Sequence, residues 1–154
     1  MVLYRERLWA TPWLYVATAL IIPACLLVFA PINLMVGVVS AVILYGGCVW
    51  MLVATSPTIE VTDTTLSAGR ARIQRSFLGV ARAYRDEAAT LARGQQLDAR
   101  AWLLIRGWVK PVVSVEVRDE NDPAPYWLLS SRHPDELAEV LNNRLPESRQ
   151  GSAG

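Results

Sequence analysis

The chain has 154 residues, a length that suits one compact unit together with a membrane anchor. Its net charge of +1 averages unlike parts, because residues 70–110 are mainly basic and acids outnumber bases from residue 116 onward. From Thr11 to Ile59 there is no Asp, Glu, Lys, Arg or His. Transport pathways and proton relays are usually built from such residues, so this composition argues against a transporter.

The apolar run is roughly twice the length of about 20 residues that one helix needs to cross a bilayer. Its single interruption, at residues 30–33, predicts a hairpin of two transmembrane helices. The first helix is expected at residues 12–30, with a kink or a missing hydrogen bond at Pro23. The second is expected at residues 32–54.

Basic residues flank both outer ends of this hairpin, whereas its tip carries no charge. Arg5 and Arg7 precede the first helix, and Arg70, Arg72 and Arg75 follow the second within about 20 residues. By the positive-inside rule, both termini are expected in the cytoplasm. We therefore expect a multi-pass protein of the plasma membrane.

Small residues in the second helix indicate close helix packing. Gly37 and Ala41 form a small-xxx-small pair, and Gly46 with Gly47 opens another surface for close approach. Two interpretations stay open: association with other transmembrane helices, or packing between the hairpin's own two helices. We favour the second.

Short β-like segments follow the hairpin. Alternation is clearest at residues 112–118, where every second residue is Val. Residues 86–93 are rich in Ala and are expected to form a short helix that ends at Gly94. The other strands are expected at residues 58–63, at 66–77 with a turn near Gly69, at 79–85 and at 126–130.

The end of the domain is predicted to be an amphipathic helix. Pro134 fits its first position, a stripe of apolar residues follows at helical spacing, and Pro146 ends it. The stripe consists of Leu137, Val140, Leu141 and Leu145. Strands closed by one C-terminal helix predict a small α+β domain, a β-barrel or sandwich with the element order of pleckstrin-homology-like domains.

Three segments are therefore expected. Residues 1–56 form an N-terminal segment and the transmembrane α-hairpin. Residues 57–146 form a cytoplasmic β-rich domain with the C-terminal helix, and residues 147–154 form a disordered tail.

The sequence contains no recognisable catalytic or metal-binding constellation. His133 is the sole histidine, and both cysteines lie in the apolar run. The acids at 119–122 lack the spacing of a calcium loop, so we interpret them as a solvated turn. We therefore expect no enzyme, no cofactor and no metal.

The basic residues after the second helix are the first candidates for a functional surface. Arg70 and Arg72 would share one face of a strand, and Arg75 is near them in sequence. Anionic headgroups attract such juxtamembrane bases by about 1 kcal/mol each. Contact with anionic lipid and a solvated face that only sets topology both stay open. Nucleic acid is not expected, because aromatic residues do not interleave with these arginines.

Trp108 is the second candidate, because it lies in a loop-like context between Arg106 and Lys110. An exposed Trp there would enter the membrane interface or anchor a protein partner. The alternative is packing in the core.

Several short segments are similar to a known family. They are Tyr4-Arg5-Glu6-Arg7-Leu8-Trp9, Ile105-Arg106-Gly107-Trp108-Val109, Val115-Glu116-Val117, Asp122-Pro123-Ala124-Pro125-Tyr126-Trp127-Leu128 and Arg132-His133-Pro134-Asp135-Glu136-Leu137. Together they resemble an actinobacterial family of short membrane proteins known as domain of unknown function 3093. The resemblance implies a two-helix membrane protein of Gram-positive, GC-rich bacteria and carries no catalytic residues.

Three functions remain as hypotheses. The first is a membrane-anchored, cytoplasm-facing interaction or scaffold module with a protein partner and contact to anionic lipid. The second is a small accessory subunit that joins a larger membrane complex through its helices. The third and weakest is an enzyme acting on lipid-linked substrates.

Overall fold

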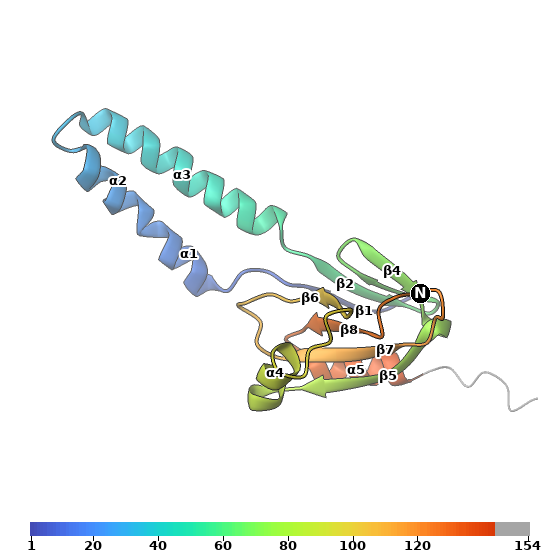
Figure 1. Cartoon of the computed structure of the whole chain (residues 1–154). Helices are drawn as coiled ribbons and strands as arrows, with labels where there is room; N and C mark the ends of the chain where they lie inside the picture. The colour runs from blue at the N-terminus through green and yellow to red at the C-terminus, as the bar shows by residue number, and fades with distance from the viewer. Residues whose placement is uncertain (144–154) are drawn as a thin grey trace, which may run out of the picture. The chain divides into compact units, whose positions relative to one another are not determined.

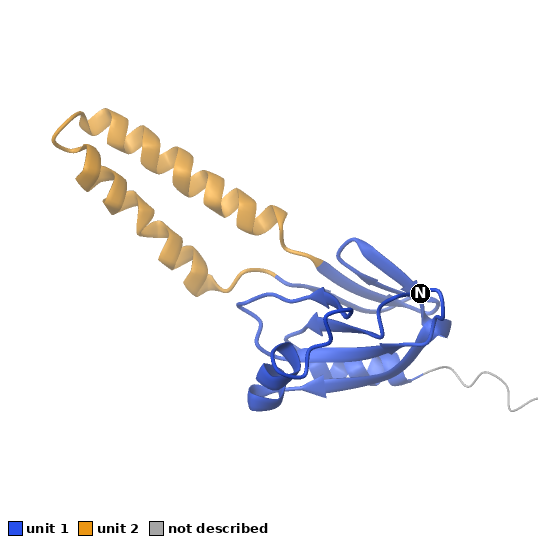
Figure 2. Ribbon diagram, viewed as in Figure 1, with its two compact units in different colours: residues 1–8, 58–154 blue, residues 9–57 orange. Residues whose placement is uncertain are grey.

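The computed structural model of the chain describes residues 1–143 and divides into two compact units (Figures 1 and 2). The helical unit consists of residues 9–57. The β unit combines residues 1–8 with the chain from Thr58 onward. The disordered tail predicted at 147–154 and the helix end predicted at Pro146 lie outside the described residues.

The first apolar segment forms two short helices, α1 (Pro12–Ala19) and α2 (Ile21–Phe29). The break between them follows from Pro23, which has no N–H to pair with the carbonyl of Ala19 four residues earlier. α1 accordingly ends at Ala19. The predicted interruption at Pro23 is confirmed, and it separates the predicted helix into two.

The second apolar segment forms one helix, α3 (Leu34–Ala54), which packs along α2 (Figure 1). It begins two residues later than predicted, because the Asn33 side chain caps it by accepting a hydrogen bond from the Met35 N–H at 2.9 Å. Residues 12–29 and helix α3 are each long and apolar enough to span a membrane.

Sheet A of the β unit contains an unexpected strand. Its antiparallel order is β1-β2-β3-β4, and β1 comes from the N-terminal segment before the helical unit. Arg7 at the end of β1 lies opposite Thr58 at the start of β2. The whole helical unit is thus inserted between two neighbouring strands. The strands are β1 (Val2–Arg7), β2 (Thr58–Thr62), β3 (Thr65–Ala68) and β4 (Ala71–Gln74).

Sheet B has the order β5-β7-β8-β6, with β6 parallel to β8 and the other pairs antiparallel. Of the two predicted alternatives, a barrel or a sandwich, the closed barrel is wrong. A 3₁₀ turn (Arg75–Phe77) follows β4, and β5 then pairs with β7 instead of β4, so the two four-stranded sheets stay separate. The strands are β5 (Leu78–Tyr84), β6 (Trp102–Leu104), β7 (Val112–Val117) and β8 (Tyr126–Ser130).

Both sheets and the C-terminal helix α5 (Pro134–Asn142) contribute to one hydrophobic core. α5 packs mainly on β5, with Leu137 and Leu141 almost completely buried as the helical stripe predicts. A smaller cluster lies under the predicted short helix α4 (Asp86–Arg93). The most buried core residues from the sheets include Ile59, Val61, Leu66, Val113, Val115 and Leu129.

Candidate functional site: a polar groove beside strand β1

A polar groove of about 450 Å³ lies in the β unit, between β1 and the segment that leads into α5. The second wall is formed by Arg132, His133 and Glu136. These residues come from the connection between β8 and α5 and from the first turn of α5, so the groove joins distant parts of the sequence. Five consecutive residues of β1 line the first wall: Leu3, Tyr4, Arg5, Glu6 and Arg7.

A hydrogen-bond network centred on Glu6 connects the two walls. The Glu6 carboxylate accepts from the Ser131 hydroxyl at 2.6 Å, the Tyr4 hydroxyl at 2.7 Å and the Arg132 N–H at 2.9 Å. The Ser131 oxygen also accepts from the His133 N–H at 3.1 Å. β1 of sheet A is thereby attached to the chain that follows β8 of sheet B.

Tyr4 stays a hydrogen-bond donor in this network over the whole neutral range. Burial raises the pKa of its phenol well above the usual value, and the neighbouring Glu6 carboxylate raises that pKa further. The hydrogen bond with Ser131 acts in the opposite direction but does not outweigh burial.

The buried members of the network are suited to positioning rather than to reaction. Ser131 is fully buried, and its hydroxyl already donates to the Glu6 carboxylate and accepts from the His133 N–H. Within residues 1–143, no three His, Cys, Asp or Glu side chains gather in a way that would hold a metal ion. The groove itself offers guanidinium groups, carboxylates and the backbone of a strand, which are the elements of a binding surface.

Arg75 lies apart from the other arginines predicted to form a surface. It is 8% exposed, and its guanidinium donates to the carbonyls of Val140 at 2.7 Å and Asn143 at 3.3 Å. It also donates to the carbonyl of Thr62 at 3.3 Å. Arg75 therefore caps the C-terminal end of α5 and does not belong to an exposed basic surface.

Arg70 and Arg72 are exposed in the hairpin between β3 and β4. Gly69 takes a positive φ of 63° in the predicted turn, where a residue without a side chain is favoured. The Arg72 guanidinium donates to the Ser67 hydroxyl at 3.1 Å on the neighbouring strand. Arg72 lies on β4, whereas Arg70 lies in the turn before it and not on the strand where it was predicted.

Trp108 is half-buried and packs against the core from the loop between β6 and β7. The Arg106 guanidinium lies 5.9 Å from the centre of its indole ring, within the range of a cation–π interaction. Within the described residues, the indole N–H of Trp108 is buried and has no hydrogen-bond acceptor. Most of the Trp108 side chain therefore packs against the core, which was the second of the two interpretations of this residue.

The small residues of α3 divide into two groups. Gly37 and Ala41 are buried, and a Cβ on Gly37 would lie 3.2 Å from the Phe29 Cβ, so this pair serves packing within the hairpin. A Cβ on Gly46 or Gly47 would meet nothing within 4 Å. These two positions are open.

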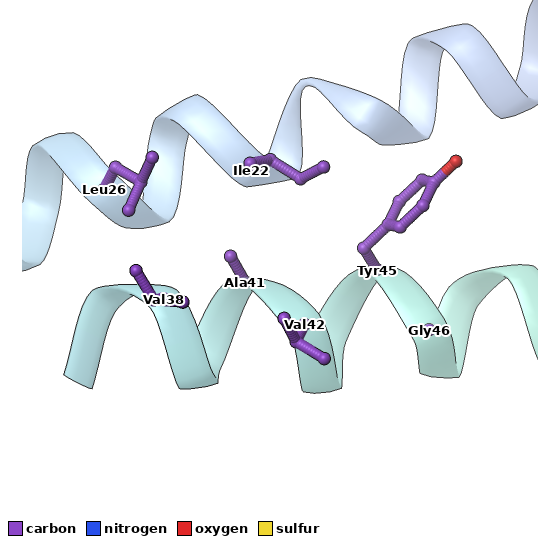
Figure 3. A pocket seen from close by; sticks show the side chains of 7 residues that line it. All are labelled: Ile22, Leu26, Val38, Ala41, Val42, Tyr45 and Gly46. Atoms are coloured by element: carbon purple, nitrogen blue, oxygen red, sulfur yellow. The ribbon is translucent and has the colours of Figure 1, made fainter. Parts of the chain in front are cut away.

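Gly46 belongs to an apolar groove of about 390 Å³ between α2 and α3. Figure 3 shows Ile22 and Leu26 on α2 opposite Val38 and Ala41 on α3, with the Tyr45 ring extending toward the other helix. Val42 completes the lining. This groove is suited to packing against a helix or a lipid acyl chain, because nearly all of its lining is hydrocarbon.

Sequence reasoning from residue types missed Tyr4, Glu6, Ser131 and Arg132 as members of a site. For Tyr4, Glu6 and Arg132 the one signal was the resemblance, since segments 4–9 and 132–137 carry it, and Ser131 had no signal. Glu6 and Ser131 are 125 residues apart, and no periodicity connects them.

These features define an α+β protein whose sheet is interrupted by a long apolar helical hairpin. The chain belongs to the family described as protein of unknown function DUF3093, whose model matches residues 3–141. The match includes both walls of the polar groove. No curated protein and no solved structure matches the chain.

Proposed function

We propose that the protein is a membrane-anchored interaction module, with its β unit and both termini on the cytoplasmic side of the plasma membrane. The observation that carries this proposal is the insertion of α1, α2 and α3 between two paired strands. A hairpin that crosses a membrane twice returns the chain to its starting side, and the pairing of Arg7 with Thr58 requires that return. An anchor of this kind connects the β unit to the membrane twice, once through β1 and once through β2.

The charges support the cytoplasmic side. Arg5 and Arg7 stand before the hairpin, and Arg70 and Arg72 stand shortly after it, whereas residues 30–33 at its tip are uncharged. Positive charges in short flanking segments are retained on the cytoplasmic side.

Only a short stretch of chain connects one end of sheet A to helix α3. At most about 14 Å of extended chain separates Thr58 from Ala54, the last residue of α3. The turn at Gly69 lies at the same end, because its N–H donates to the Thr58 carbonyl at 2.9 Å. This placement supports contact between Arg70 and anionic headgroups, each such base adding about 1 kcal/mol.

Reporter fusions test the orientation. A cytoplasm-active reporter should be active at both Met1 and Gly154, and a reporter that requires export should be inactive at both. Export at either end would overturn the cytoplasmic assignment.

The lipid contact needs a second measurement on the full chain in nanodiscs. Hydrogen exchange of the β3–β4 turn should be slower in anionic than in neutral nanodiscs, and the difference should disappear at high salt. The variant Arg70→Gln with Arg72→Gln should lose the difference. Arg82→Gln, an exposed arginine of sheet B, is the matched control. Equal exchange in both lipids would leave Arg70 and Arg72 as topology determinants.

An accessory subunit is the second candidate function, and the apolar groove between α2 and α3 favours it. Gly46 leaves part of that groove open, so a helix of another membrane protein would find a close-approach surface there. Gly46→Leu should then lower the apparent mass of the native membrane complex on a non-denaturing gel, because the partner helix is lost. Gly47→Leu, equally unobstructed but outside the groove, should leave the complex intact.

We keep the pleckstrin-homology-like fold as a proposal for the β unit. Its support is the succession of strands followed by one C-terminal helix, α5, which covers β5. The inserted hairpin and the parallel pairing of β6 with β8 would be this family's own additions.

A further inference from the structure

The Tyr45 hydroxyl is a polar group near the middle of an apolar helix. At a rise of about 1.5 Å per residue, Tyr45 lies about 17 Å from the start of α3 at Leu34 and about 14 Å from its end at Ala54. The hydrocarbon core of a bilayer is about 30 Å thick, so this hydroxyl would lie far from water on either side. A hydroxyl in hydrocarbon is unfavourable unless it finds a hydrogen-bond acceptor.

Within residues 1–143, the Tyr45 hydroxyl has no hydrogen-bond partner. A short hydroxyl side chain can bond its own helix, as Thr18 does by donating to the Tyr15 carbonyl at 2.9 Å. The tyrosine ring holds its hydroxyl too far from its own backbone for such a bond. The Tyr45 hydroxyl therefore needs an acceptor from a molecule that packs against this helix.

The Tyr45 ring extends into the apolar groove between α2 and α3, so the groove is the place for that molecule (Figure 3). Gly46 leaves the groove open, because a Cβ there would meet nothing within 4 Å. The occupant should be apolar, should approach closely at Gly46 and should carry one acceptor at the depth of Tyr45. A lipid acyl chain meets the first two conditions but has no oxygen at that depth.

We propose that the occupant is a second copy of this chain, so that two hairpins pair face to face through their grooves. Copies inserted in the same orientation have Tyr45 at the same depth, and each phenol is both a donor and an acceptor. One Tyr45 hydroxyl would donate to the other across a two-fold axis along the membrane normal. α2 and α3 of both copies would form a four-helix bundle, with Ile22, Leu26 and Val42 in its core.

The inference rests on the proposal that the helical unit crosses the membrane, and it names the occupant of the groove considered above for an accessory subunit. A helix of another protein would need an acceptor at the depth of Tyr45, whereas a second copy has one by symmetry. The pair would carry two β units on the same side of the membrane. A partner with two binding sites would then be held by avidity.

Energy transfer between purified copies tests the pairing without any other protein. Full-length chains with a donor or an acceptor dye at Gly154 are reconstituted together in phosphatidylcholine vesicles, which are then diluted with lipid. Transfer should persist after dilution has removed random proximity. Gly46→Leu should weaken pairing by about tenfold or more, because it fills the point of closest approach. Gly47→Leu, equally unobstructed but outside the groove, is the matched control and should pair like the wild type.

Tyr45→Phe tests the hydrogen bond itself, because it removes one oxygen and keeps the ring. Pairing should weaken by about threefold, the usual effect of one hydrogen bond between membrane helices. Tyr15→Phe, in α1 and outside the groove, is the control and should have no effect. Pairing of Tyr45→Phe equal to that of the wild type would show that the hydroxyl finds its acceptor within one hairpin, and would overturn the proposal.

Crosslinking at two neighbouring positions locates the contact. Val42 and Ile43 are 67% and 66% exposed, but of these two only Val42 lines the groove. In a background of Cys25→Ala and Cys48→Ala, oxidation with copper phenanthroline should link two copies of Val42→Cys and leave copies of Ile43→Cys unlinked. Preferential linking through Ile43→Cys would overturn the assignment of the groove as the contact surface.

A monomeric chain in the diluted vesicles would also overturn the pairing. A helix of another protein would then be the occupant if Gly46→Leu still lowered the apparent mass of a native membrane complex, and lipid chains would be the occupant if it did not. Reporter fusions measure membrane orientation separately. Pairing without cytoplasmic reporter activity would overturn the cytoplasmic assignment alone, and cytoplasmic reporter activity without pairing would overturn the dimer alone.

Discussion

The carboxylate of Glu6 accepts a hydrogen bond from the hydroxyl of Ser131 at 2.6 Å, although the two residues are 125 positions apart. Glu6 lies on β1, directly before the helical unit, and Ser131 follows β8, directly before α5. The contact therefore fixes the strand that leads into the apolar helices to the opposite sheet. It also determines the position of both walls of the groove.

Glu6→Gln should weaken the attachment of β1. The amide keeps one acceptor but presents an N–H₂ group to partners that are themselves donors, and hydrogen bonds to a charged group contribute about 1.5–3 kcal/mol. We expect a loss of about 2 kcal/mol in unfolding free energy and faster hydrogen exchange in β1. Glu139→Gln, on the exposed side of α5, is the control. Unchanged exchange in β1 would show that backbone pairing with β2 suffices.

Arg75→Met should destabilise the β unit through α5. The substitution keeps an apolar chain of similar length but leaves carbonyls at the end of α5 without their donor, at a cost of about 2–3 kcal/mol. Arg75→Lys should recover part of this loss, since a single ammonium cannot match the guanidinium fork. Urea unfolding followed by Trp fluorescence measures both. An equal effect from exposed Arg72→Met would contradict the assignment of Arg75 as a helix cap.

Gly37→Leu should separate α2 from α3. A Cβ at this position already lies 3.2 Å from the Phe29 Cβ and 3.4 Å from the Cys25 carbonyl, so a larger side chain forces the helices apart, at about 1–3 kcal/mol. Thermal loss of helical circular dichroism in detergent should begin at a lower temperature. Gly47→Leu adds the same atoms where nothing obstructs them and should have little effect. Identical melting of the two variants would exclude close packing at Gly37.

Tyr4 should make the β unit sensitive to alkali. Because burial raises the pKa of Tyr4, the native state keeps the phenol proton to a higher pH than the unfolded chain, whose tyrosine ionises near 10.0. The stabilising contribution is therefore complete below pH 10.0 and is lost as pH rises through the native value.

Tyr4→Phe should remove that alkaline dependence and cost about 1 kcal/mol at neutral pH, where it deletes the hydrogen bond to Glu6. Unfolding midpoints of the two proteins, compared from neutral to alkaline pH, provide the measurement. Tyr84→Phe is the control. Parallel curves for wild type and Tyr4→Phe would argue that Tyr4 does not ionise on unfolding.

The elements with a strong local signal could be predicted from the sequence. The absence of charge from Thr11 to Ile59 defined the apolar helices, and the alternating valines defined β7. The 3.6-residue stripe through Leu137 and Leu141 correctly placed α5 against the core. Each of these signals lies within a few turns or one strand, so it needs no knowledge of the rest of the fold.

The remaining features depend on partners far along the chain. β1 contains three charged residues in six, which resemble the basic flank of a membrane helix, and its pairing strand begins only at Thr58. Arg75 follows two exposed arginines in sequence, and only the end of α5 makes its burial favourable. The groove was likewise inaccessible to pattern reasoning, because its walls are brought together by the tertiary fold.

The insertion of the hairpin also imposes an order on biosynthesis. β1 leaves the ribosome before β2, and residues 8–57 must be synthesised before β2 emerges to pair with it. At about 5–20 residues per second, that delay lasts roughly 3–10 s. During this interval the N-terminal strand has no neighbour in its sheet, while the apolar helices pass from the ribosome. Sheet A of the β unit therefore cannot form before α1, α2 and α3 have been synthesised.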